Sequence, residues 1–269
     1  MKSGKIVKPR KLSDEKANAR KLNRQQLERA NDTAKKNQKS QLASPTIPFD
    51  PNDHILLVGE GDFSFAHSIV SEHGCADVLA TCFDSEDQLL QKYPQAKIHI
   101  DYLTSLDQSV LYSVDATKLQ QKVIRKGQQW DRIIFNFPHV GGKSTDVNRQ
   151  VRYNQELLVS FFRAAYPQLS PGGTIIVTLF EGEPYTLWNI KDLARHVGLK
   201  VVTSFKFISK AYPEYEHART LGNIEGGGGW KGEERDARTY IFQLNESEEK
   251  QNNAAKKRKA DDSSSDDED

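Results

Sequence analysis

The sequence is poor in cysteine and has no long apolar run. Only two of its 269 residues are cysteine, Cys75 and Cys82, too few for a disulfide scaffold or for a zinc site with cysteine spacing. We therefore expect a reducing compartment and no bound metal. No apolar stretch reaches the roughly 18 residues of a membrane span, and no apolar segment follows the basic N-terminus, as a secretory signal requires. Membrane proteins and secreted disulfide-rich proteins are both disfavoured.

The net charge is only +1, but the two signs are unevenly distributed. Residues 1–44 hold 13 basic and 4 acidic side chains and no aromatic one, whereas residues 245–269 hold 9 acidic and 5 basic ones. Neither segment can bury enough apolar surface to offset the entropy of ordering it. We predict a basic disordered arm (1–44), a folded domain (45–244) and a disordered acidic tail (245–269). The arm either binds an acidic surface, becoming helical there, or only keeps the chain soluble. The cluster Lys256-Lys257-Arg258-Lys259 indicates nuclear import.

Within the predicted domain, short apolar runs alternate with helical patterns. The runs predict strands at 55–58, 78–83, 109–114, 132–137, 174–180, 200–208 and 238–244, and helices at 64–73, 85–93, 117–125, 148–166 and 186–196. Ser85 is the predicted cap of its helix, and Pro171-Gly172-Gly173 predicts a turn. The first five strands are continuous apolar runs, which is typical of parallel strands buried on both faces. The last two strands follow each other with no helix between them. The pattern predicts an α/β, Rossmann-like fold: a seven-stranded, mostly parallel sheet, helices on both faces and an antiparallel last strand.

The first motif follows the first strand. It reads Gly59-Glu60-Gly61-Asp62-Phe63-Ser64-Phe65 and leads from the strand into a helix. Glycines at such a turn let the backbone bend tightly and approach a ligand, because no Cβ intervenes. Ser64 stands where a dinucleotide-binding fingerprint has its third glycine, which disfavours a pyrophosphate cofactor. The motif predicts a cofactor-binding turn; an ordinary strand-to-helix turn is the alternative.

Two acidic residues follow the next two strands. A carboxylate at Asp84, directly after the second strand, can accept both hydroxyls of a ribose, although an acid there also favours the start of a helix. Asp115, after the third strand, is suited either to accept an adenine amino group or to cap the next helix. Together they predict a nucleoside-containing cofactor without identifying it.

The fourth strand ends in Asn136-Phe137-Pro138-His139, which resembles the Asn-Pro-Pro-aromatic box of amino methyltransferases. The Asn136 amide can accept from the N–H of a base such as uracil and donate to the neighbouring carbonyl. Phe137 can stack on an unpaired base, and Pro138 stiffens the turn. His139 can donate to a base carbonyl or relay a proton. The alternative is a plain strand exit in which Asn136 bonds to the backbone.

A long loop separates the last two strands. Its first half reads Tyr212-Pro213-Glu214-Tyr215-Glu216-His217-Ala218-Arg219-Thr220, and its second half contains Gly226-Gly227-Gly228-Gly229, which we expect to be mobile. The first half predicts substrate contacts. Tyr212 and Tyr215 offer stacking faces, Arg219 can bind a phosphate or carbonyl, and His217 can bind phosphate or move a proton. In the alternative, a structural flap, the tyrosines pack on the core and Arg219 pairs with a nearby glutamate.

The stretch from His54 to Leu244 resembles the large-subunit ribosomal RNA uridine-N3 methyltransferase family. The resemblance rests on the glycine motif at 59–65, on the Asn136 box with the Val140-Gly141-Gly142-Lys143 that extends it, and on the loop at 212–220. It implies a class I methyltransferase fold, S-adenosylmethionine as methyl donor, a ribosomal RNA or preribosomal substrate, and residence in the nucleolus. We expect a monomer. One alternative is a non-catalytic RNA-binding or ribosome-assembly protein on the same fold. A nicotinamide-dependent dehydrogenase is disfavoured, because the third glycine and a proton-donating pair are missing.

Overall fold

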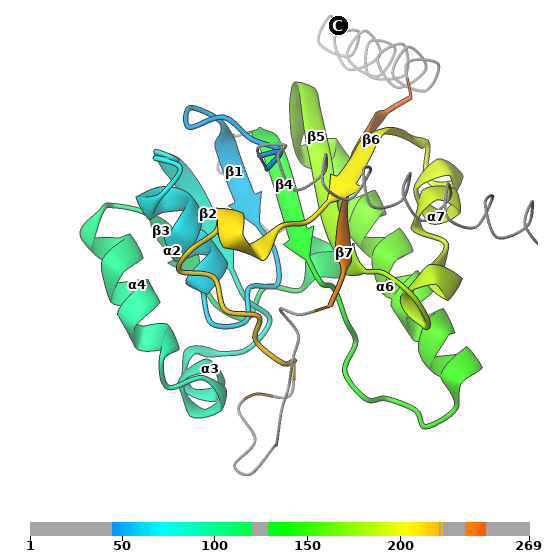
Figure 1. Ribbon diagram of the computed structural model, residues 1–269, viewed down its shortest axis with the longest axis horizontal. Coiled ribbons are helices and arrows are strands. Elements are labelled where there is room, and N and C mark those ends of the chain that lie inside the picture. Colours follow the sequence, from blue (N-terminus) through cyan, green and yellow to red (C-terminus); the bar gives the residue numbers. More distant parts are fainter. Residues whose placement is uncertain (1–44, 120–128, 221, 223–234, 246–269) are drawn as a thin grey trace, which may run out of the picture. The chain divides into compact units, whose positions relative to one another are not determined.

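Seven strands form a single sheet in the order β3-β2-β1-β4-β5-β7-β6 (Figure 1). The strands are β1 (His54–Leu57), β2 (Asp77–Thr81), β3 (Ser109–Leu111), β4 (Trp130–Asn136), β5 (Leu169–Phe180), β6 (Leu199–Lys206) and β7 (Ala237–Leu244). Strands β1 to β5 pair in parallel, and β7 lies antiparallel between β5 and β6. The predicted α/β fold, with its mostly parallel sheet and antiparallel last strand, is confirmed.

The structure is a computed structural model that describes residues 45–119, 129–220, 222 and 235–245. Apart from Pro45, these residues belong to the unit Thr46–Asp269, and the fold described is that of this unit. Several predictions concern residues outside the described ranges: the basic arm (1–44), most of the helix at 117–125, the glycine run at 226–229 and the tail from residue 246 onward with its basic cluster.

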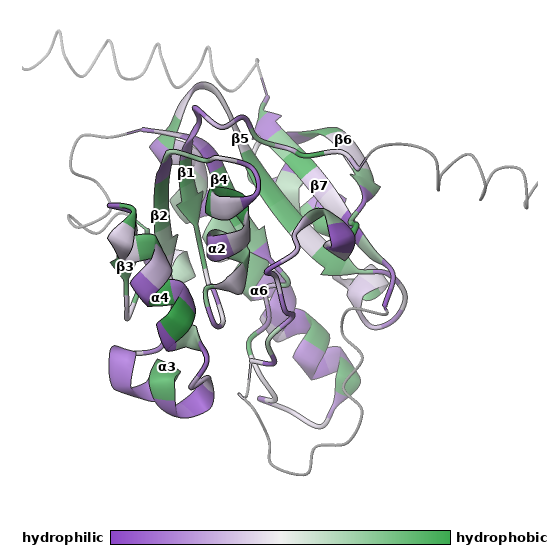
Figure 2. Ribbon diagram, turned by 60° about the vertical axis from the view of Figure 1, so that its left-hand side comes forward, coloured by the Kyte–Doolittle hydropathy of each residue, from purple (hydrophilic) through white to green (hydrophobic). Residues whose placement is uncertain are grey.

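The central strands bury alternate residues on opposite faces of the sheet. Ile55 and Leu57 belong to one hydrophobic core, and Leu56 and Val58 belong to the other. The first core is covered by α2 (Ser64–Ser71), α3 (Glu86–Lys92) and α4 (Ala96–Ser105), and the second by α6 (Val147–Ala165) and α7 (Ile190–His196). In Figure 2 the hydrophobic colour is concentrated on the strands, whereas α3 is mostly hydrophilic. Burial on both faces explains why these strands are continuous apolar runs.

Three elements differ from the sequence prediction. Helix α4 lies between α3 and β3 in a segment with no predicted element, and it buries only Ala96 and Leu103, so its apolar stripe is weak. Strand β5 begins at Leu169, and the predicted turn at 171–173 is instead an irregular stretch of strand pairing. The helix predicted at 186–196 is divided by Asn189, whose φ of 51° ends a 3₁₀ turn (Tyr185–Trp188) just before α7. The capping role predicted for Ser85 at α3 is confirmed, with Gln88 completing the capping box.

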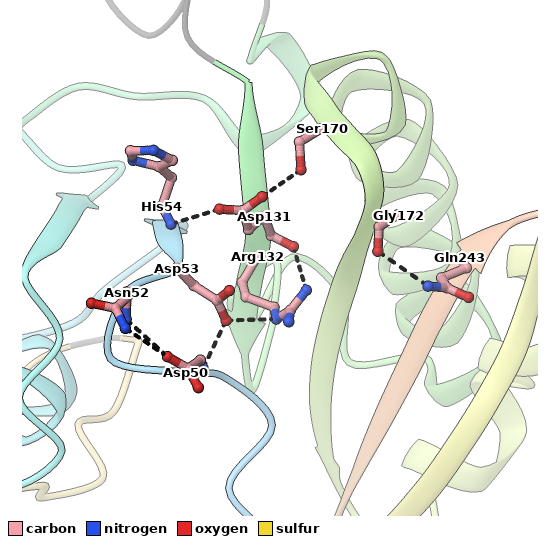
Figure 3. Close-up of polar contacts among 9 residues, drawn as sticks. All are labelled: Asp50, Asn52, Asp53, His54, Asp131, Arg132, Ser170, Gly172 and Gln243. Atoms are coloured by element: carbon pink, nitrogen blue, oxygen red, sulfur yellow. Dashed lines mark hydrogen bonds and ion pairs between the residues drawn. The ribbon is translucent and has the colours of Figure 1, made fainter.

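Polar contacts align the amino ends of β1 and β4 (Figure 3). The Asp131 carboxylate accepts from the His54 backbone N–H at 3.0 Å, and Asp53 pairs with Arg132 at 3.0 Å. Strand order reverses between β1 and β4, because β2 and β3 lie on one side and β5 on the other. In open α/β sheets ligands bind at this reversal, outside the carboxyl ends of the strands. The glycine motif after β1 and the Asn136 motif after β4 therefore meet where a ligand site is expected.

Candidate active site

A cleft of about 600 Å³ lies at the carboxyl ends of β1, β2 and β4. It brings together residues from every predicted motif. Its walls include Gly59, Glu60, Gly61, Asp62, Ser64, Phe65, Asp84, Asp115, Asn136, Phe137, His139, Tyr215 and His217. Four predicted site residues do not line it: Phe63, Pro138, Tyr212 and Arg219. The sequence motifs thus converge on one place, with individual exceptions.

The glycine turn is required by close packing. Gly59 has a φ of 70°, and a Cβ on it would lie 2.4 Å from the Phe135 ring. A Cβ on Gly61 would lie 2.8 Å from the Cβ of Ala218, in the long loop. The prediction that Phe63 binds cofactor needs correction. Its side chain is fully buried in the core, and the residue, with a φ of 65°, directly precedes α2. Phe63 therefore packs in the core next to the turn and does not face the cleft.

Two carboxylates of this turn behave differently. Asp62 is 3% exposed, and its carboxylate accepts from the Ser64 backbone N–H at 3.1 Å and the Gln95 amide at 3.2 Å. Glu60 accepts from the Ala66 backbone N–H at 3.2 Å. Burial raises the pKa of Glu60 to about 8, and the negative charge of Asp62 acts in the same direction. Asp62 therefore stabilises the turn, while Glu60 is a carboxyl group that holds its proton near neutral pH.

The acids after β2 and β3 each have a partner. Asp84 pairs with Lys92 of α3 at 2.7 Å, and both line the cleft. Asp115 caps a short 3₁₀ helix by accepting from the Thr117 backbone N–H at 2.9 Å and its hydroxyl at 2.7 Å. The capping alternative for Asp115 is thus observed, although its side chain also faces the cleft. The sequence analysis missed two residues that line the cleft, Lys92 and Phe83. Phe83 is 71% exposed, and the only sequence signal for it was its position directly before Asp84.

The motif after β4 adopts a strained turn. Phe137 has a φ of 50°, its backbone N–H donates to the Thr178 carbonyl at 2.8 Å, and its ring contacts those of Phe180 and His217. Pro138 is buried and lies outside the cleft, in keeping with a stiffening role. Among the described residues, the buried Asn136 Nδ2 has no hydrogen-bond partner. The backbone-bonding alternative therefore leaves this donor unexplained.

His139 is fixed by the loop that follows it. The Gly141 backbone N–H donates to His139 Nδ1 at 2.9 Å. Helix α6 holds this loop, because Gln150 donates to the Gly141 carbonyl at 2.6 Å and Asn154 accepts from the Val140 N–H at 3.1 Å. Burial lowers the pKa of His139. An Nδ1 that accepts a hydrogen bond carries no proton, so the imidazole is neutral and held in one orientation.

The loop after β6 folds back over the first motif. The Tyr93 hydroxyl donates to the Arg219 carbonyl, and Ser64 Oγ bonds to the backbone of Glu216. Tyr212 is only 4% exposed and stacks on Phe207, with ring centroids 5.4 Å apart. Its predicted contact with substrate needs correction, because it is a core residue, as in the structural-flap alternative.

The remaining residues of this loop do face the site. The Tyr215 hydroxyl lies 2.8 Å from His217 Nδ1, and both line the cleft. Burial lowers the pKa of His217 to about 4. Arg219 lines an adjoining pocket of about 370 Å³, whose walls also include Phe137, His139, Leu179, Phe180, Tyr185 and His217. The sequence analysis missed Leu179 and Phe180 at the end of β5 and Tyr185 in the turn that follows. Nothing in the local sequence distinguishes these residues from core residues.

The described part of the chain contains no group of three His, Cys, Asp or Glu side chains arranged to hold a metal ion. Within the same residues, no helix has the length and apolar character needed to span a bilayer. Cys75 and Cys82 are buried free thiols, and burial raises the pKa of each to about 12. These thiols are accordingly poor nucleophiles.

A sheet of this order, with a glycine turn after β1, acids after β2 and β3 and an Asn-aromatic-Pro box after β4, defines a class I methyltransferase. The particular family follows from comparison. The model of the BMT5-like family, described as rRNA (uridine-N3-)-methyltransferase BTM5-like, matches residues 56–219, and the chain belongs to this family. The resemblance seen in the sequence is confirmed.

Individual proteins are also similar. The 25S rRNA (uridine(2634)-N(3))-methyltransferase of Saccharomyces cerevisiae is 33% identical over 268 residues, covering 79% of this chain and 79% of that protein. Heavy metal-associated isoprenylated plant protein 41 of Arabidopsis thaliana is 36% identical over 65% of this chain, but only over 34% of its own length. Among solved structures, a methyltransferase from Pyrococcus furiosus is 21% identical, with a TM-score of 0.43, over 71% of this chain and 76% of that one.

Proposed function

We propose that the 600 Å³ cleft binds S-adenosylmethionine and that the enzyme methylates N3 of a uridine in large-subunit ribosomal RNA. One observation carries the proposal: Asn136 Nδ2 is buried at the end of β4 with no partner among the described residues. Leaving a buried donor unsatisfied costs about 1–3 kcal/mol. A ligand carbonyl at the cleft wall would remove that cost, and the carbonyls beside N3 of uracil have the required chemistry.

The residues of the cleft suit S-adenosylmethionine. The turn at Gly59 and Gly61 has no room for side chains, and Asp84 presents a carboxylate where ribose hydroxyls are held in folds of this kind. The exposed ring of Phe83 offers a face for adenine, and Asp115 can accept the adenine amino group while keeping its capping bonds. When bound, this cofactor supplies an electrophilic methyl group on a positively charged sulfur.

The protein's own task is then to orient the base and exclude water. Asn136 can donate to a uracil carbonyl, and Phe137 and His217 form one continuous aromatic wall, with ring centroids 4.5 Å apart. The name of the yeast relative supports a uridine of large-subunit rRNA as the target. The basic cluster at residues 256–259 supports nuclear import, and we propose the nucleolus, where preribosomal RNA is available, as the site of action.

The test is to incubate the purified full-length chain with S-adenosylmethionine and rRNA from cells that lack the activity, then to digest the RNA and measure 3-methyluridine by mass spectrometry. Asn136→Ala should lose most product while keeping cofactor affinity and melting temperature. Asn148→Ala, on the exposed start of α6, is the matched control and should behave like wild type. If wild type binds the cofactor but forms no 3-methyluridine, a non-catalytic role in ribosome assembly replaces the proposal.

A further inference from the structure

The 370 Å³ pocket beside the main cleft has walls suited to a pyrimidine ring. The two spaces share Phe137, His139 and His217, so a ring in the pocket presents one edge to the cleft. Phe180 and Tyr185 also line the pocket, with ring centroids 5.4 Å apart, and the Arg235 guanidinium lies over both rings, 4.4 and 5.2 Å from their centroids. Aromatic faces of this kind stack on unpaired bases. Because a base inside a folded RNA is stacked or paired, it reaches such a pocket only after leaving the stack.

The hydrogen bond from Gly141 determines what His139 can do. Nδ1 accepts the Gly141 N–H at 2.9 Å, so a neutral imidazole must carry its own proton on Nε2. His139 is then a donor toward the site and not a proton acceptor. Gly141 has a φ of 76° and its carbonyl is held by Gln150, which fixes the direction of its N–H.

We propose that the 370 Å³ pocket holds the flipped-out target uracil, and that His139 Nε2–H donates to one carbonyl flanking N3 while Asn136 Nδ2 donates to the other. This inference rests on the proposed function and adds to it an explanation of why the enzyme would select uridine over cytidine. Uracil has a carbonyl on each side of N3, so both donors find acceptors. Cytosine has an amino group on one side, which would place donor against donor whichever way the ring lies, and a mismatch of this kind is strongly discriminating.

The same two donors favour ionisation of the base. When the N3–H bond breaks, the proton leaves to solvent, and the electron pair stays on the ring and spreads onto the two flanking oxygens. Donors fixed beside those oxygens stabilise this charge without reorganising. The other titratable or charged side chains that line the pocket are Tyr185, His217 and Arg219. Those that line the adjoining cleft are Glu60, Asp62, Asp84, Lys92, Tyr93, Asp115, Lys143, Tyr215 and Glu216.

The test compares His139→Ala and His139→Gln with wild type in single-turnover formation of 3-methyluridine, from pH 6.5 to 9.5. Removing one such donor should lower the rate at pH 7 by on the order of 10²-fold. The deficit of His139→Ala should shrink as pH rises, because hydroxide then ionises N3 without help. It should also shrink on RNA carrying 5-fluorouridine at the target, whose N3–H is more acidic. His139→Gln, whose amide retains an N–H donor, should recover part of the rate.

A deficit of His139→Ala that stays constant with pH and is unchanged on 5-fluorouridine RNA would overturn the proposal and make His139 a structural residue. Tyr185→Ala tests the pocket separately: it should raise the KM for RNA while cofactor affinity stays unchanged. Tyr153→Ala on α6, whose ring lies outside the pocket, is the matched control and should match wild type. Equal KM values for both tyrosine variants would place the base elsewhere. If wild type itself makes no 3-methyluridine, the proposed function fails; if wild type is active and His139→Ala equals it, only this inference fails.

Discussion

Ser64 and Glu216 are 152 residues apart in the chain, yet one hydroxyl joins them twice. Ser64 Oγ donates to the Glu216 carbonyl and accepts from the Glu216 backbone N–H, both at 3.1 Å. Ser64 is fully buried at the start of α2, beneath the loop that carries Tyr215 and His217. The Gly59–Phe65 motif therefore holds the Tyr212–Thr220 loop in place, and residues predicted to bind cofactor also position residues predicted to bind substrate.

Ser64→Ala should destabilise the protein and loosen this loop. Losing the hydroxyl leaves two backbone groups of Glu216 without this partner, so we expect a loss of about 1–3 kcal/mol in unfolding free energy. Urea denaturation measures it. Ser68→Ala is the matched control on the same helix: Ser68 is equally buried, but its Oγ has no partner among the described residues, so its removal should cost little. Equal losses for the two variants would mean that the contact with Glu216 is not stabilising.

Asp84→Ala should weaken the binding of S-adenosylmethionine. A carboxylate that accepts from ribose hydroxyls contributes about 1.5–3 kcal/mol, or roughly 10- to 150-fold in affinity. Calorimetric titration measures the change. Because Asp84 also pairs with Lys92 at 2.7 Å, Lys92→Met removes the ion pair and keeps the carboxylate. It should retain most of the affinity. If both variants lose affinity equally, Asp84 acts through the ion pair, and the ribose is held elsewhere.

Glu60 should make stability fall as pH rises from about 4.5 to about 8. Its pKa is raised in the folded state from 4.5 to about 8, mainly by burial, so the folded chain keeps a proton that the unfolded chain has released across this window. The folded state thus binds more protons, and stability declines until the pH passes the folded pKa. Glu60→Gln cannot ionise and should be more stable than wild type above pH 8, with the gain decreasing toward pH 4.5.

Thermal melts of wild type and Glu60→Gln at pH 5, 6.5 and 8 measure this difference. Glu72→Gln, at the exposed end of α2, is the control and should leave the pH profile unchanged. Parallel melting curves for wild type and Glu60→Gln at all three values would show that Glu60 ionises normally in the folded protein.

Substitutions of Tyr212 and Arg219 should have different effects, because the first residue supports the loop structurally and the second is placed to contact substrate. Tyr212 packs against Phe207 and Phe65 in the core, so Tyr212→Ala should lose about 3–5 kcal/mol of stability. Arg219 lines the smaller pocket, and Arg219→Ala should lose methylation of the target uridine while melting near the wild-type temperature. Early melting or lost cofactor affinity in Arg219→Ala would assign this side chain to the scaffold as well.

Much of the fold could be predicted from the sequence because the relevant signals are local. Continuous apolar runs, glycines after the first strand and the cap at Ser85 each reflect interactions among neighbouring residues, and the structure confirms the order and type of the strands. Helix α4 was missed because it has no strong local signal. It buries only Ala96 and Leu103, so its sequence has no strong helical stripe, and packing against α2 and the sheet decides its place.

By itself, the sequence determined that three motifs follow the strands of one parallel sheet, and hence that they meet at its carboxyl edge. Only the tertiary structure decided which side chain of each motif faces the cleft. Phe63 and Tyr212 face the core, whereas Phe180 and Tyr185, from outside the motifs, line the smaller pocket. The physical reason is that helices and strands repeat the direction of their side chains with a fixed period, whereas turns and loops do not. The direction of an aromatic side chain in a loop therefore cannot be predicted from its neighbours in the sequence. Its burial depends on partners distant in the chain, as the contact of Tyr212 with Phe65 shows.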